Sequence, residues 1–118
     1  MGREIENCII VGAGMGLSAS LASLFRKENM NVVLAARNIK KLDNLKRELG
    51  CHLIQCDASD PTQVEQLFAA TDKLIGQPKM VVYNPSARVR GEITSLDPLE
   101  TKQALDITCY GAFLVAQQ

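Results

Sequence analysis

Short apolar runs alternate with segments of helical period along the chain, and this alternation restricts the possible folds more than any other feature. Four runs are predicted to be buried strands: residues 8–11, 31–36, 51–56 and 80–83. Their near-continuous apolar character is typical of parallel strands that are covered on both faces. The order of the elements therefore predicts an α/β fold, with an open, doubly wound parallel sheet in strand order 3-2-1-4.

Apolar residues at helical spacing lie between the predicted strands. The stripes comprise Leu17, Leu21, Leu24 and Phe25, then Ile39, Leu42, Leu45 and Leu49, and then Val64, Leu67 and Phe68. Asp60 before Pro61 and Asp97 before Pro98 predict the N-caps of two helices. Gly50 stands where the second helix should end.

The chain has 118 residues, with thirteen basic and thirteen acidic side chains. This balance argues against a nucleic-acid-binding surface and against a polybasic membrane anchor. No apolar run approaches the ~20 residues that span a bilayer. Residues 1–6 lack the character of a secretory or transit signal, and Glu6 argues against myristoylation of Gly2. We therefore expect a cytoplasmic protein.

The four cysteines, Cys8, Cys51, Cys56 and Cys109, show no CxxC spacing and lie in apolar segments. We expect buried, reduced thiols, with neither disulfides nor a metal site. The single histidine, His52, is interpreted as a strand residue.

Three glycines, Gly12, Gly14 and Gly16, separate the first predicted strand from the first helix. A turn without side chains lets the backbone approach a pyrophosphate, and the helix N-terminus offers free N–H groups. We interpret this turn as a nucleotide-binding site; the alternative is an ordinary turn rich in glycine. The common GxGxxG fingerprint requires a further glycine where Leu17 stands, which weakens flavoprotein and long-chain dehydrogenase interpretations.

The spacing instead resembles the GxxxGxG turn of the short-chain dehydrogenase/reductase family, whose members have a Rossmann fold. Ser18 stands where that family usually has its last glycine. We expect this substitution to be tolerated, with slightly looser helix packing. The resemblance implies that residues of the turn bind a dinucleotide: Gly12, Gly14, Met15, Gly16 and Leu17.

The second strand ends in Ala36 and Arg37, without the acidic residue that usually holds the ribose hydroxyls of NAD. Arg37 is suitably placed for a 2′-phosphate, which favours NADP(H) over NAD(H) as the cofactor. Alternatively, Arg37 is only a solvated loop residue. Met15 stands where NADP-binding relatives often carry a second basic residue.

Two further segments resemble family motifs. Asp57 matches an aspartate that binds the adenine amino group, and Ala58 an adjacent ring contact; alternatively, Asp57 only caps the turn. The segment from Asn84 resembles the NNAG motif, with Asn84 matching its first Asn and steadying the sheet. By the same likeness, Ser86 and Ala87 pass near the adenine ribose.

Residues 105–114 resemble the family's fourth-helix motif, in which an Asn of the catalytic tetrad orders a proton-relay water. Thr108 stands at that position, with a shorter side chain and a different set of hydrogen-bond donors than Asn. Tyr110 is not the catalytic tyrosine, because Leu114 stands where the lysine of YxxxK is required.

The resemblance implies hydride transfer between a nicotinamide and a small-molecule carbonyl or alcohol. The catalytic YxxxK pair of the family is absent from the 118 residues. We therefore interpret residues 1–118 as the N-terminal part of a single Rossmann dinucleotide-binding domain of a longer reductase. This part would carry only the cofactor-binding half.

Two alternatives remain open at this point. One is a non-catalytic half-domain that binds dinucleotide or oligomerises. The other is a methyltransferase, against which the missing acid after the second strand argues.

By resemblance, residues 98–118 would form a homo-oligomer interface through Leu105, Phe113 and Leu114, although these side chains could equally face the sheet.

Overall fold

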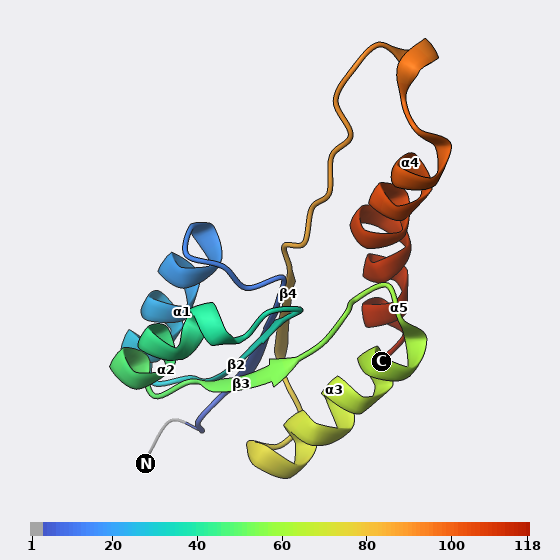
Figure 1. Ribbon diagram of the computed structural model, residues 1–118. Coiled ribbons are helices and arrows are strands. Elements are labelled where there is room, and N and C mark those ends of the chain that lie inside the picture. The colour runs from blue at the N-terminus through green and yellow to red at the C-terminus, as the bar shows by residue number, and fades with distance from the viewer. Residues whose placement is uncertain (1–3) are drawn as a thin grey trace.

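The computed structural model describes residues 4–118 and has a four-stranded sheet at its centre (Figure 1). The strands are β1 (Asn7–Val11), β2 (Asn31–Ala36), β3 (His52–Gln55) and β4 (Met80–Tyr83). All pairs are parallel and the order is β3-β2-β1-β4, which confirms the predicted fold class. His52 lies in β3 as expected. Gly2 lies outside the described residues.

Helices connect the strands and follow β4. They are α1 (Leu17–Lys27), η1 (Lys40–Leu42), α2 (Asp43–Leu49), α3 (Pro61–Leu74), η2 (Ile93–Ser95), α4 (Pro98–Leu105), the π-helical turn η3 (Asp106–Tyr110) and α5 (Gly111–Gln117). The side chain of Asp60 caps α3 and that of Asp97 caps α4, each by accepting backbone N–H bonds. Gly50 ends α2 with a φ of 70°. The three predicted helix boundaries are therefore confirmed.

Each face of the sheet carries its own core, because successive side chains of β1 and β2 point to opposite faces. On one face, Cys8 and Ile10 of β1 pack with α1 and α2. On the other, Ile9 and Val11 pack with α3 and α5. Figure 1 shows α1 and α2 on one side of the sheet and α3 and α5 on the other, so the sheet is doubly wound.

The predicted apolar stripe of α1 is wrong in part. Leu17 is 63% and Leu24 50% exposed, whereas the buried residues of this helix are Ser18 and Ala22. Leu21 and Phe25 do pack against the core while partly buried, but the fully buried positions carry small side chains, which allow the helix backbone to lie close to the sheet. Helical period alone did not distinguish this narrow contact from a leucine stripe.

Three of the cysteines are buried free thiols, as expected, but Cys109 is exposed on the π-helical turn. Burial raises the pKa of Cys8 and of Cys56 from 9.0 to about 11, with smaller contributions from Cys51 and from Asp57 and Asp60, respectively. Burial also raises the pKa of Cys51. The three buried thiols are therefore protonated at neutral pH. Within residues 4–118, no cluster of three or more His, Cys, Asp or Glu is arranged to hold a metal ion.

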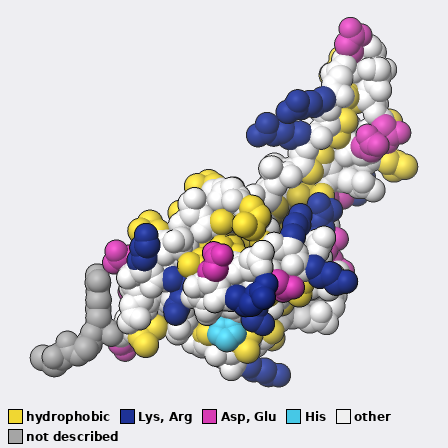
Figure 2. All heavy atoms as spheres, turned by 60° about the vertical axis from the view of Figure 1, so that its left-hand side comes forward, with side chains coloured by type: hydrophobic (Ala, Val, Ile, Leu, Met, Phe, Trp, Pro, Cys, Tyr) yellow, Lys and Arg dark blue, Asp and Glu magenta, His cyan; other side chains and the backbone are white. Residues whose placement is uncertain are grey.

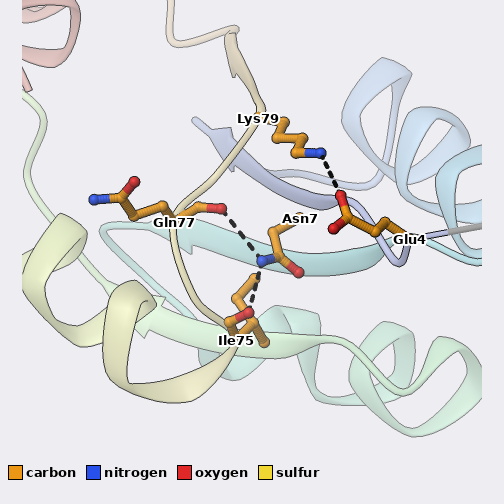
Figure 3. A network of polar contacts seen from close by, with 5 residues as sticks. All are labelled: Glu4, Asn7, Ile75, Gln77 and Lys79. Atoms are coloured by element: carbon orange, nitrogen blue, oxygen red, sulfur yellow. Dashed lines mark hydrogen bonds and ion pairs between the residues drawn. The ribbon is translucent and has the colours of Figure 1, made fainter.

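Asn7 organises the amino end of the sheet (Figure 3). Its Nδ2 atom donates to the carbonyls of Ile75 and Gln77, at 2.6 and 3.2 Å. Its backbone carbonyl accepts from the backbone N–H of Lys79, whose ammonium group pairs with Glu4 at 3.2 Å. These bonds attach the segment before β4 to β1. Asn7 is the first residue of β1, and the glycine turn follows the last, so this polar network and the turn lie at opposite ends of the sheet.

An extended arm, residues 84–97, leaves β4 and returns through α4 (Figure 1). The arm makes the molecule elongated, 61 Å along one axis against 27 and 22 Å along the others. Arg88 and Arg90 are exposed, and Figure 2 shows basic side chains on the surface of the arm.

No helix within the described part of the chain is long and apolar enough to cross a bilayer.

Candidate functional site

A pocket of about 470 Å³ opens where the carboxyl ends of the strands meet. Seven residues singled out from the sequence line it: Gly12, Ala36, Arg37, Asp57, Ala58, Asn84 and Ser86. The remaining candidates lie outside its lining: Gly14, Met15, Gly16, Leu17, Ala87 and Thr108. Parallel strands bring their carboxyl ends to one edge, which explains why residues so distant in sequence converge. A larger cavity, of about 710 Å³, lies between α3, α5 and β4, away from these residues.

The three glycines of the turn differ in their surroundings. A Cβ atom on Gly12 would lie 2.7 Å from Cγ of Pro85, and Gly12 also has a φ of +82°. A Cβ atom on Gly14 or Gly16 would meet nothing within 4 Å. The protein's own packing therefore requires glycine at position 12, whereas the space beside Gly14 and Gly16 is open to a ligand. Gly16 also precedes α1, whose first turn has neither a side-chain cap nor an acidic residue.

Arg37 follows β2 at the rim of the pocket. Its backbone carbonyl accepts a 3.0 Å hydrogen bond from the side chain of Gln55 at the end of β3. Lys41 in η1 lines the same pocket, as does Asn38. Sequence reasoning missed Lys41; its position four residues after Arg37, just past the end of β2, was a usable signal. The site thus has two cations, whereas Arg88 and Arg90 of the arm do not line it.

Asp57 uses one carboxylate oxygen to stabilise its own turn. Oδ1 accepts from the hydroxyl of Ser59 at 2.7 Å and from its backbone N–H at 3.0 Å. The hydrogen bond from the Ser59 side chain lowers the pKa of Asp57, and the charge of Arg37 adds to this effect. Gln63 of α3 accepts from the backbone N–H of Asp57 at 2.8 Å. The turn-capping role is therefore present, and Oδ2 is left for a further donor.

Ser18 and Asn84 connect the start of α1 to the end of β4. The Nδ2 atom of Asn84 donates to Oγ of Ser18 at 3.0 Å, and that hydroxyl donates to the carbonyl of Gly12 at 3.4 Å. Ser18 is 2% exposed, so the fold accommodates the serine in the core. The backbone N–H of Asn84 also donates to the carbonyl of Val11 at 2.9 Å, which attaches the end of β4 to β1.

Tyr83 reaches from β4 to the π-helical turn. Its hydroxyl donates to the carbonyl of Ile107, and burial raises its pKa, so it remains a donor at neutral pH. Gly111 makes this contact possible, because a Cβ atom there would collide with the Tyr83 hydroxyl and lie 2.8 Å from the carbonyl oxygen of Ala58. Neither Tyr83 nor Gly111 was singled out from the sequence.

Thr108 makes its contacts with the arm. Its hydroxyl accepts from the backbone N–H of Ala87 at 3.1 Å and lies 3.3 Å from the Ala87 carbonyl, to which it donates. Both functions of the hydroxyl are thereby used. Thr108 thus holds Ala87, which follows the pocket residue Ser86, and this arrangement argues for positioning rather than proton relay.

A family model described as enoyl-(acyl carrier protein) reductase matches residues 12–118. The chain belongs to the short-chain dehydrogenase/reductase family. This membership confirms the resemblance drawn from the glycine turn and from the motifs after β3 and β4.

The chain is also similar to individual proteins, in sequence or in fold. An uncharacterized oxidoreductase of Staphylococcus aureus (strain USA300) is 26% identical over 112 residues, which are 92% of this chain and 48% of that protein. Our chain thus spans about half the length of the curated relatives it matches. A solved structure of an actinorhodin polyketide ketoreductase with NADPH has a TM-score of 0.91 at 23% identity. The match covers 96% of this chain and 45% of the ketoreductase chain.

A second solved structure is that of an NADH-dependent reductase complexed with NAD. It superimposes with a TM-score of 0.87 at 12% identity, over 97% of this chain and 50% of that one. The two structural relatives therefore share the fold but carry different dinucleotides.

Proposed function

We propose that this chain is the cofactor-binding half of an NADP(H)-dependent oxidoreductase. The bound dinucleotide would supply or accept a hydride at its nicotinamide, with a small-molecule carbonyl or alcohol as the second substrate. Arg37 and Lys41 both line the pocket, and their two positive charges carry the choice of cofactor. Two cations and no carboxylate at the end of β2 favour a 2′-phosphate over free ribose hydroxyls.

Residues of the glycine turn and residues that line the pocket would each bind a different part of the cofactor. Gly14 and Gly16 leave room for the pyrophosphate, and the N-terminus of α1 offers its free N–H groups. Asp57 would accept from the adenine amino group through Oδ2. Ala36, Ala58 and Ser86 would border the adenosine.

Isothermal titration calorimetry with NADPH, NADH and S-adenosylmethionine tests this function directly. We expect NADPH to bind more tightly than NADH, and S-adenosylmethionine not to bind. Equal affinities for NADPH and NADH would remove the argument from Arg37 and Lys41. Preferential binding of S-adenosylmethionine would favour a methyltransferase instead.

A non-catalytic half-domain is the second candidate, because no YxxxK pair occurs in the 118 residues. NADPH oxidation by this same chain with generic carbonyl substrates separates the two. Turnover would exclude a role limited to binding, whereas binding without turnover would support it for this chain.

We further propose that α4, η3 and α5 (residues 98–117) form a homo-oligomer interface. Leu105 and Phe113 are exposed, and the rings of Phe113 and Tyr110 are stacked with centroids 6.2 Å apart. Leu114 is buried in the core and is not available for this contact. Sedimentation velocity with Phe113→Ser would report a loss of association.

The free thiols support a cytoplasmic location, which cell fractionation would test.

A further inference from the structure

Ser18 brings a buried hydroxyl to the position where the family usually has a glycine. This hydroxyl contacts two groups that come from different elements: the carbonyl of Gly12 in the turn, at 3.4 Å, and Nδ2 of Asn84 after β4, at 3.0 Å. Asn84 and Gly12 both line the pocket. A glycine at position 18 could make neither contact, so the connection belongs to this chain's own sequence.

The two hydrogen bonds have a fixed direction. A serine hydroxyl has a single proton, and here it is donated to the Gly12 carbonyl, which can only accept. The Ser18 oxygen must therefore accept from Asn84, and the carboxamide must present its nitrogen. If the carboxamide were turned over, Oδ1 would take the serine proton and the Gly12 carbonyl would lose this donor. Only one orientation of the amide therefore serves both contacts.

We propose that Ser18 is a positioning residue that orients the Asn84 carboxamide, so that Oδ1 serves the pocket as an acceptor. The ligand group that it receives is a hydroxyl or amino donor of the dinucleotide, and this part of the inference depends on the proposed function. Asn84 would thus have two roles: its side chain accepts a hydrogen bond from the ligand through Oδ1, and its backbone N–H donates to the carbonyl of Val11.

NMR of the ligand-free protein tests the link between the two side chains. The side-chain amide protons of Asn84 should exchange slowly in the unaltered protein and at least about fivefold faster in Ser18→Ala and Ser18→Gly, because one net hydrogen bond is lost. Ser18→Gly installs the usual residue of the family and should remain folded. Ser20→Ala, at an exposed position on the same helix, is the matched control. Unchanged exchange in both Ser18 variants would overturn the link.

Affinity for NADPH tests the role of Oδ1. Ser18→Ala should weaken binding by about 3- to 10-fold in the unaltered background, and by much less when Asn84→Ala is already present. Equal losses in both backgrounds would show that Ser18 acts through the fold alone and would overturn the orienting role. If the unaltered protein binds no NADPH, the proposed function and the ligand contact of Asn84 both fail, while the NMR result decides the Ser18–Asn84 link separately.

Discussion

Gly12 packs so closely on Pro85 that a Cβ atom would lie 2.7 Å from the Cγ atom of the proline ring. The first glycine of the turn therefore fits against the end of β4, and its φ of +82° adds a second demand for glycine. Gly14 and Gly16, in contrast, face open space. The same short turn thus contains one glycine that the fold requires and two that are free to serve a ligand.

This difference predicts opposite results for alanine substitutions in the turn. Gly12→Ala should reduce the free energy of unfolding by at least about 2 kcal/mol, from the left-handed backbone and the collision with Pro85. Gly14→Ala and Gly16→Ala should leave stability nearly unchanged but weaken NADPH binding, because the methyl groups occupy the space for the pyrophosphate. Urea denaturation and calorimetry measure the two effects. Normal NADPH affinity in both of the latter variants would contradict the assignment of the turn.

Arg37 and Lys41 are expected to act on one cofactor only. Arg37→Ala should weaken NADPH binding by about 1–3 kcal/mol, the usual scale for hydrogen bonds to charged groups, and Lys41→Ala should weaken it by less. NADH affinity should change little in either variant. Lys46→Ala, an exposed lysine of α2 that does not line the pocket, is the control in the same titrations. Equal losses for NADPH and NADH would refute a contact with the 2′-phosphate.

The contact between Tyr83 and the π-helical turn should be visible in stability. Tyr83→Phe removes one hydrogen bond and should cost about 1 kcal/mol. Gly111→Ala should cost about 1–3 kcal/mol, because the added methyl group meets both Tyr83 and the Ala58 carbonyl. The double variant should recover part of that loss, since the tyrosine hydroxyl is gone. Additive losses in thermal denaturation would show that the two residues do not interact.

Burial of the thiols predicts a loss of stability at alkaline pH. The pKa values of Cys8 and Cys56 rise from 9.0 to about 11 on folding, so the folded state holds these protons more tightly than the unfolded state. Their contribution to stability is complete below pH 9 and decreases as the pH rises through about 11. Urea denaturation at a series of pH values would measure this, and Cys56→Ala should make the decrease smaller. The same decrease in that variant would rule out a contribution from Cys56.

Exposure predicts which cysteine reacts first. Cys109 lies on the surface of η3, whereas the other three thiols are buried. Iodoacetamide under native conditions should label Cys109 alone, and the remaining cysteines should react only after unfolding. Peptide mass spectrometry after short exposure identifies the modified site. Rapid labelling of Cys56 would show that the pocket admits the reagent to that thiol.

Sequence pattern identified most of the fold, because the signals involved are local. Apolar runs located β2 and β4 to the residue, and the caps at Asp60 and Asp97 were correct because capping depends on a few neighbouring residues. The leucine stripe of α1 was wrong in part because period does not report how closely a helix approaches a sheet. The exposure of Cys109 was missed because an apolar neighbourhood in sequence does not decide which side of a helical turn faces solvent.

The sequence by itself determined the strand order and the family, since the alternation of elements and the motifs after each strand are carried by short segments. Only the tertiary structure decided which side chains meet. Ser18 and Asn84 are separated by 66 positions, and Lys41 and Arg37 both line a pocket that all four strand ends build. The physical reason is that parallel crossovers gather distant strand ends at one edge, where hydrogen-bond direction and close packing depend on partners that no local pattern contains.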